Sequence, residues 1–361
     1  MRILLTDATG LLGPPLLERL LARGDIVRVL ILRETPHDLQ HRNDVEVIEG
    51  SLSDVDVLIK ATKNVEVVYH LAQLSPAPER TGVDFVRVNV QGTENLLRAC
   101  GPHIRRFVFR SAVSVYRPAP FPFMWPITEN ASLGAHGHDP LRYYGQTKIE
   151  AENLVRRFHR ERGFEYIILR PTVVYGRGSR FVEQLLAEII SRPWLALSRG
   201  AEWGVMQWVH VSDMAEAVVL TGTQSEAANQ VFNVAGNEAI TVEKVIRTVW
   251  QIIAGRSQKW MQRFQNAAAR SDGLKFDISK AQAMLGWTPH MTLREGLEEM
   301  LWEIINPQIA PPAWPSLSQE FNTEALWRTF SEENTTQQFQ GYDPQRDRGM
   351  PPVRRPRHWE V

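Results

Sequence analysis

The chain has 361 residues, of which 43% are hydrophobic and 23% charged, and its 41 basic and 41 acidic residues balance to a formal net charge of zero. This composition supports a sizeable core, and the balanced charge gives no indication of a nucleic-acid or membrane-surface partner. The single cysteine, Cys100, excludes an intrachain disulfide, and no apolar run reaches the roughly 18 residues that a membrane-spanning helix needs. We expect a cytoplasmic protein, with either one large α/β domain and an appended lobe or two ordinary domains.

Strands and helices alternate over the first half of the chain. A short apolar run at 2–6 leads into a turn, and a leucine stripe then predicts a helix that stops at Gly24. Further strands are expected at 26–32, 45–48, 65–71, 106–109 and 166–169, and further helices at 89–100 and 144–162. This alternation predicts a parallel sheet with right-handed crossovers.

The pattern changes beyond residue 176. Helices are expected at 181–191, 212–221, 241–253 and 293–305, with a strand at 231–234, which predicts a mixed lobe over 177–305. The last segment, 306–361, is rich in Pro, Gln, Glu and Arg but carries Trp314, Trp327 and Trp359. We expect part of it to pack as an arm and part to be disordered.

The turn after the first strand has the composition of a dinucleotide-binding loop. It reads Thr6-Asp7-Ala8-Thr9-Gly10-Leu11-Leu12-Gly13. At such a turn the backbone N–H groups of the helix N-terminus face a pyrophosphate, and glycines let the two backbones approach. Asp7 stands where the first glycine is usual, and three interpretations stay open. Asp tolerates left-handed geometry; its charge weakens dinucleotide binding; or it reaches a ribose hydroxyl.

Tyr144 and Lys148 form the strongest catalytic signal. Residues four apart share one face of a helix, so the lysine can stand beside the phenol and favour its ionised form. A phenol has a reference pKa of about 10 and needs such help to act as an acid or base near neutrality. The neighbouring Tyr143 fits this spacing less well.

Several segments resemble the extended short-chain dehydrogenases/reductases, in particular the NAD(P)-dependent epimerase/dehydratase family. Residues 6–13 are similar to T-G-x-x-G-x-x-G, 89–97 to N-V-x-G-T-x-N-L-L, and 144–152 to Y-G-x-S-K-x-x-A-E. Residues 169–176 resemble L-R-P-x-x-V-Y-G, and the resemblance continues to about residue 305. It implies a Rossmann-type doubly wound parallel sheet in 1–176, to which later segments return, with a smaller mixed α/β substrate lobe in 177–305. It also implies a homodimer acting on a nucleotide sugar.

The resemblance places a cofactor, NAD(P), at the carboxyl ends of the strands. The residues implied are Thr6, Asp7, Thr9, Gly10, Leu11, Leu12, Gly13, Arg33, Ser51, Leu52, Leu71, Ala72, Gln73, Asn89, Lys148, Pro171 and Val174. NAD-preferring relatives carry an acidic residue where this chain has Ile31, and Arg33 could meet a 2′-phosphate. The pattern weakly favours NADP(H) over NAD(H), unless Arg33 is an ordinary surface arginine.

The third catalytic position of the family departs from the pattern. A Ser or Thr is usual four residues before Tyr116, but this chain has Ala112, which cannot donate a hydrogen bond. Ser111 or Ser114 could substitute if the loop shifts. Arg110 is also unusual where relatives carry a small hydroxyl residue.

The remaining site residues follow from the same resemblance. It implies substrate contacts from Glu129, Tyr175, Gln207 and His210. His70 lies in a segment similar to H-L-A-A and is expected to be a scaffold residue, and no His/Cys/Asp cluster in the sequence indicates a metal site.

Three functions remain open. The first is an active NAD(P)-dependent oxidoreductase, epimerase or dehydratase, favoured by the intact Tyr144 and Lys148. The second is a catalytically impaired binder or scaffold. It is favoured by the joint departures at Asp7, Ile31, Ser51 and Ala112. The third is an enzyme that uses the same fold for a different reaction, without net redox change.

Overall fold

The computed structural model describes residues 1–35, 38–77, 79–117, 126–135, 141–191, 206–254 and 275–305. The chain divides into two compact units, Met1–Glu303 and Ile304–Val361, and the segment 306–361, for which an arm was expected, lies outside the described residues. None of the described helices is long and apolar enough to cross a membrane.

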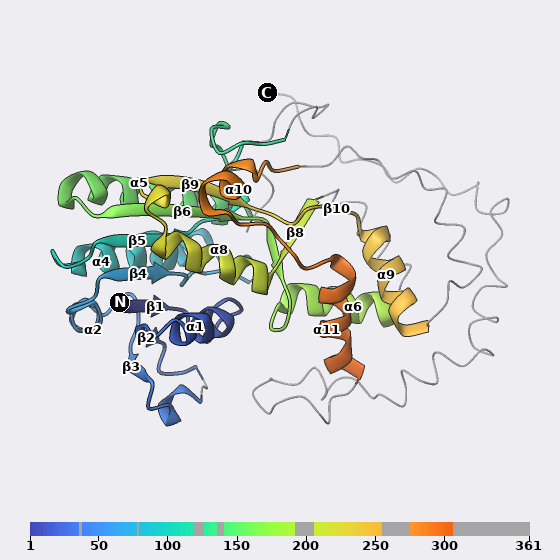
Figure 1. Ribbon diagram of the computed structural model, residues 1–361, viewed down its shortest axis with the longest axis horizontal. Helices are drawn as coiled ribbons and strands as arrows, with labels where there is room; N and C mark the ends of the chain where they lie inside the picture. Colours follow the sequence, from blue (N-terminus) through green and yellow to red (C-terminus); the bar gives the residue numbers. More distant parts are fainter. Residues whose placement is uncertain are drawn as a thin grey trace. The chain divides into compact units, whose positions relative to one another are not determined.

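A seven-stranded parallel sheet forms the centre of the first unit (Figure 1). Its strands in spatial order are β3 (Val45–Glu49), β2 (Ile26–Ile31), β1 (Arg2–Thr6), β4 (Val67–His70), β5 (Arg106–Arg110), β6 (Glu165–Pro171) and β9 (Gln230–Val234). The predicted doubly wound α/β class is confirmed. The strand expected in the lobe at 231–234 is instead β9, which pairs in parallel with β6 and completes this sheet. Periodicity predicts a strand but not its partner, because pairing depends on where the chain returns.

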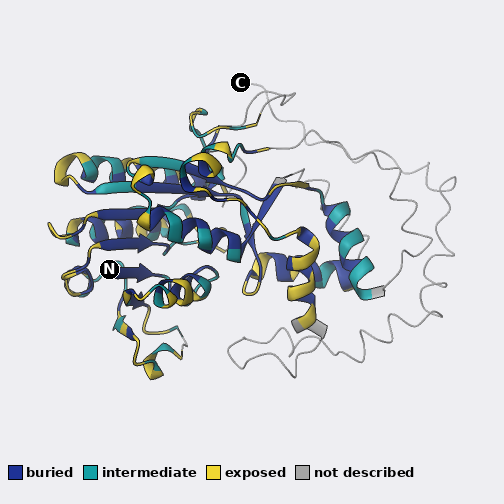
Figure 2. Ribbon diagram, viewed as in Figure 1, coloured by how far each residue is buried: buried dark blue, intermediate teal, exposed yellow. Residues whose placement is uncertain are grey.

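Helices cover both faces of the sheet, because successive strand residues point to opposite sides. Ile3 and Leu5 belong to one core cluster and Leu4 to the other. The first cluster lies under α1 (Gly13–Ala22) and α8 (Val211–Thr223). The second lies under α2 (Val55–Thr62), α4 (Gly92–Ala99) and α5 (Leu141–Arg162). Figure 2 shows the resulting buried strands between half-buried helices.

The helix expected to begin at Asn89 begins earlier. The chain is helical from α3 (Gly82–Phe85), where Thr81 and Asp84 form a capping box, and continues through a wide turn, η2 (Val86–Gln91), into α4. Such π-helical turns often mark functional sites, and this one contains the buried Asn89.

The lobe is built around a small mixed sheet, in the order β10 (Ala239–Ile240), β8 (Met206–His210) and β7 (Val173–Tyr175). Its described helices are α6 (Arg180–Ser191), α9 (Val242–Ala254) and α11 (Leu293–Ile305). The helix α10 (Ser279–Leu285), which was not predicted, returns to the main sheet and packs against β9 and α8. The chain leaves the main sheet at Pro171, the last residue of β6, and enters the small sheet with β7 at Val173.

Candidate active site

The loop between β1 and α1 has the backbone of a phosphate-binding turn. The Gly10 N–H donates to the Asp7 carbonyl over 3.1 Å, and the Gly13 N–H to the Gly10 carbonyl over 3.2 Å. A Cβ atom at Gly13 would lie 2.3 Å from the Ala8 backbone, so only glycine fits there. The buried Leu12 precedes the helix, and Thr9 and Leu11 are half-buried in the turn. The backbone of this loop fits a dinucleotide.

The side chain of Asp7 fits a dinucleotide less well. Asp7 adopts a left-handed φ of 64°, and its carboxylate oxygens lie 2.4 Å from where a Gly10 Cβ would be. The carboxylate thus covers the glycine that normally lets the backbone approach a pyrophosphate. Burial raises the pKa of Asp7 to about 6, against the opposing charges of Arg110 and Lys148.

The adjacent ends of β1 and β4 are joined by a buried hydrogen-bond chain. The Thr6 hydroxyl oxygen accepts from the backbone N–H groups of Leu71 and Ala72 at 3.1 and 3.0 Å, so its proton points to His70 Nδ1, 3.0 Å away. His70 Nε2 then donates to Thr93 Oγ1 over 3.0 Å. Burial, and then the charge of Lys148, lower the pKa of His70 to about 3. His70 is therefore a neutral scaffold residue.

Tyr144 and Lys148 lie on the buried face of α5, as their spacing predicted. The Lys148 Nζ atom lies 5.8 Å from the centre of the Tyr144 ring and donates to the backbone carbonyl of Arg110 over 2.8 Å. The Tyr144 hydroxyl donates to Gln73 Oε1 over 3.1 Å. The pair therefore stands at the carboxyl ends of β4 and β5, where ligands bind in open parallel sheets.

The unusual Arg110 contributes to the electrostatics of this pair. Burial raises the pKa of the Tyr144 phenol, and the charge of Arg110 is the main influence against that rise. Burial, and then Arg110, lower the pKa of Lys148 well below its ordinary value. The Arg110 Nε atom is buried and has no hydrogen-bond partner among the described residues.

The three positions considered for the catalytic hydroxyl differ in their surroundings. Ala112 is 8% exposed and packs in an apolar cluster with Phe85 and Tyr144. The buried Ser111 hydroxyl donates to Glu152 over 2.6 Å, so it already belongs to another network. The buried Ser114 hydroxyl has no hydrogen-bond partner in the described part of the chain.

The network that holds Ser111 was not predicted. The buried Glu152 accepts two hydrogen bonds from the guanidinium of Arg170, at 2.9 and 2.7 Å, and a further one from Arg156. Arg170 also donates to the Tyr116 hydroxyl over 3.0 Å. The sequence signal was present, since Glu152 ends the tyrosine-helix motif and Arg170 lies in the L-R-P segment, but only the fold joins them.

The four residues expected to contact substrate are tied to the scaffold. The Gln207 Nε2 atom donates to the Gly236 carbonyl over 2.7 Å, and its Oε1 atom accepts from the Phe276 N–H over 2.6 Å. A Glu129 carboxylate oxygen accepts from the Asn233 N–H, the Tyr175 hydroxyl donates to a backbone carbonyl, and His210 Nδ1 bonds Ser212. The Gln207 side chain is therefore buried and held in place by backbone groups on both sides.

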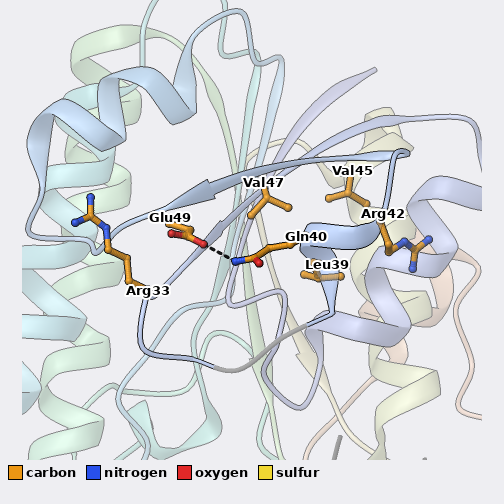
Figure 3. Close-up of a pocket in the computed structure, with 7 residues that line it drawn as sticks. All are labelled: Arg33, Leu39, Gln40, Arg42, Val45, Val47 and Glu49. Atoms are coloured by element: carbon orange, nitrogen blue, oxygen red, sulfur yellow. Dashed lines mark hydrogen bonds between the residues drawn. The ribbon is translucent and has the colours of Figure 1, made fainter.

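Arg33 borders an open cavity of about 790 Å³ at the sheet edge, away from Tyr144. Figure 3 shows Arg33 and Glu49 toward one end of it, with Gln40 donating to Glu49 over 2.8 Å. Glu49 pairs in register with Ile31, the position where an acidic residue was missing. Register partners in parallel strands point to the same face, so a carboxylate stands beside that position after all.

Other residues of the expected cofactor set make contacts with neighbouring residues of the scaffold. Ser51 Oγ lies 2.7 Å from Ser53 Oγ, and the Leu52 side chain packs where a Gly92 Cβ would meet it at 2.9 Å. Asn89 bonds the backbone of Leu74. Within the described residues, no group of three His, Cys, Asp or Glu side chains could hold a metal ion.

Comparison with known proteins agrees with this geometry. The sequence model described as the NAD dependent epimerase/dehydratase family matches residues 3–235. The chain belongs to this family. The UDP-glucose 4-epimerase of Vibrio cholerae is 26% identical over 332 residues, covering 82% of this chain and 93% of the epimerase.

Solved structures of relatives contain NAD and nucleotide sugars. MoeE5 in complex with UDP-glucose and NAD is 26% identical, with a TM-score of 0.66 over 84% of this chain and 99% of that chain. The fold is also that of UDP-glucuronic acid 4-epimerase from Bacillus cereus in complex with UDP-glucuronic acid and NAD. That structure gives a TM-score of 0.68 at 24% identity, over 86% of this chain and 100% of that chain.

Proposed function

We propose that this protein is an NAD(P)-dependent enzyme that oxidises or reduces a hydroxyl-bearing carbon of a nucleotide sugar, in an epimerase, dehydratase or reductase reaction. The observation that carries the proposal is the placement of Tyr144 and Lys148 on one buried face of α5, next to a loop whose backbone fits a dinucleotide. A bound dinucleotide would supply the hydride acceptor or donor.

Each residue of the pair has a distinct role in this proposal. Tyr144 takes the proton from the sugar hydroxyl, or returns it to the carbonyl oxygen, as general base and acid. Lys148 holds the cofactor ribose. The positive charge that opposes the burial-induced rise in the pKa of Tyr144 is that of Arg110, a role that the helical spacing had suggested for Lys148.

The proposal is tested by turnover. Purified protein should bind a dinucleotide and convert UDP-glucose or UDP-glucuronic acid, the ligands of the relatives above. The second candidate, an impaired binder or scaffold, is supported by the carboxylate over Gly10 and by the apolar Ala112. Binding without turnover would favour an impaired binder, and failure to bind NAD(H) and NADP(H) would remove the enzymatic function and favour a scaffold. The homodimer and the cytoplasmic location remain predictions from the sequence.

We predict that NAD(H) binds more tightly than NADP(H). The solved relatives contain NAD, which gives no support to the weak NADP(H) preference expected from Arg33. Glu49, in register with Ile31, would repel a 2′-phosphate and could accept from ribose hydroxyls. Calorimetric titration with both cofactors checks this, with Glu49→Gln expected to narrow the difference and Arg33→Ala to leave NAD affinity unchanged. Tighter binding of NADP(H) than of NAD(H) would instead support the interpretation that Arg33 binds a 2′-phosphate.

We predict that Asp7→Gly strengthens dinucleotide binding about tenfold, which corresponds to about 1.4 kcal/mol. It removes a carboxylate from the pyrophosphate approach and relaxes a left-handed backbone. Asp7→Asn is the matched variant, because it removes the charge but keeps the volume.

The pH dependence separates charge from volume. Since the Asp7 pKa is about 6, the wild-type affinity should fall as pH rises through 6, and Asp7→Asn should lose this dependence. Weaker binding by Asp7→Gly would mean instead that Asp7 makes a favourable ribose contact.

A further inference from the structure

The side chain of Gln73 contacts the phenol of the proposed acid/base. Gln73 follows β4 at a position where the family pattern H-L-A-A has a small residue, and the Tyr144 hydroxyl donates to its Oε1 atom over 3.1 Å. A carboxamide also carries two N–H donors on the atom beside that oxygen. Gln73 therefore brings hydrogen-bond donors to the group that moves the proton.

Hydrogen bonds fix the backbone on both sides of Gln73. The two N–H groups before it donate to the Thr6 hydroxyl, and the N–H of Leu74 after it donates to Asn89 Oδ1 over 2.7 Å. Asn89 Nδ2 in turn donates to Thr147 Oγ1 over 3.2 Å, on the helix that carries the tyrosine. Asn89 thus couples the Gln73 turn to α5, which holds the carboxamide near the phenol.

This chain has no hydroxyl at the family's donor position, 112, and the Ser114 hydroxyl, which is unpartnered among the described residues, is the other candidate donor nearby in the sequence. Ala112 presents a methyl group in an apolar cluster with Tyr144, and the Ser111 hydroxyl is directed to Glu152. The hydrogen bond of the Tyr144 hydroxyl within the described residues is the one to Gln73. Both departures from the family pattern, the hydroxyl lost at Ala112 and the carboxamide gained at Gln73, therefore lie beside the phenol of Tyr144.

We propose that Gln73 is a catalytic residue that donates a hydrogen bond from Nε2 to the reacting oxygen of the substrate, in the role that Ala112 leaves vacant. The inference rests on the proposed function, because it requires a substrate oxygen beside Tyr144. The carboxamide can also turn with the proton state of the phenol. Oε1 accepts from neutral Tyr144, whereas Nε2 would donate to the phenolate, and this charge-assisted bond is the stronger one.

A double-mutant cycle tests the donor role. Gln73→Ala, Ala112→Ser and the double variant are assayed with NAD and UDP-glucose or UDP-glucuronic acid. Gln73→Ala should lower kcat by about 10²–10³-fold, as for the loss of one oxyanion donor, with little change in the KM for the nucleotide sugar. Ala112→Ser should restore most of this loss but change the wild type little. If Ala112→Ser raises the kcat of the wild type and of the Gln73→Ala protein by the same factor, residues 73 and 112 do not share a role and the proposal is overturned.

A second measurement does not depend on turnover. The ionisation of Tyr144 is followed by its phenolate absorbance, with Tyr144→Phe as the subtraction. Gln73→Leu, of similar size, should move the midpoint to higher pH, and the exposed Gln146→Ala on the same helix should not. An unchanged midpoint in Gln73→Leu would overturn the role of Gln73 alone. A wild-type protein that binds NAD but converts neither nucleotide sugar would overturn the proposed function and the donor role together.

Discussion

Tyr144→Phe should lower turnover by about 10²–10⁴-fold, the usual contribution of a positioned acid/base, while the fold and NAD binding stay nearly intact. The change deletes one oxygen, whose hydrogen bond to Gln73 is the interaction lost, and such a bond stabilises a protein by only about 0.5–1.5 kcal/mol. Single-turnover hydride transfer with UDP-glucose or UDP-glucuronic acid measures the effect.

Tyr143→Phe is the matched control. Tyr143 precedes the proposed acid/base on the same helix, and its ring packs against Gly82, 3.1 Å from where a Cβ would lie. Its variant should keep wild-type turnover. If Tyr144→Phe retains full activity in an active protein, the proton is carried by another group and the assignment fails.

Glu152→Ala should lower the free energy of unfolding by about 3–5 kcal/mol, the usual effect of removing one partner of a buried ion pair. Glu152 is fully buried and Arg170 is 2% exposed, so the substitution leaves a guanidinium in the core without its carboxylate. Ser111 and Arg156 lose an acceptor as well. Urea denaturation followed by circular dichroism measures the loss.

Glu150→Ala, two residues earlier on the exposed face of α5, is the control and should stay within about 0.5 kcal/mol of wild type. A Glu152→Ala protein as stable as this control would mean that the network contributes nothing to stability.

The acid sensitivity of the fold provides an independent check on the same network. Burial alone would raise the pKa of Glu152, but the hydrogen bonds from Arg170 and Ser111 hold it below its ordinary value of 4.5. A lowered folded pKa contributes stability above pH 4.5 that is lost as pH falls through the folded value. The wild type should therefore lose stability below pH 4.5 more steeply than Glu152→Gln, whose amide does not titrate there.

Patterns in the sequence were enough to predict most strands and helices of the main sheet and the motifs whose residues are close along the chain. Mostly apolar runs indicated β1, β2, β4, β5 and β6, because a strand buried on both faces needs nearly continuous hydrophobicity. The edge strand β3 is only partly buried. The Tyr144–Lys148 pair followed from helical spacing alone. The loop at 6–13 was recognisable because its glycines stand between a strand and a helix.

The contacts between residues that are distant along the chain follow from the fold. Gln73 and Tyr144 are 71 positions apart, and the partners Ser111 and Glu152 are 41 apart. Likewise, Glu49 stands beside Ile31 through strand register, and β9 belongs to the main sheet through its pairing with β6. Periodicity fixes which face of an element is apolar, but register, pairing and side-chain direction follow from packing the whole chain. The residues that distinguish this protein from its family pattern could therefore be noted in the sequence, but their roles depend on neighbours that only the fold supplies.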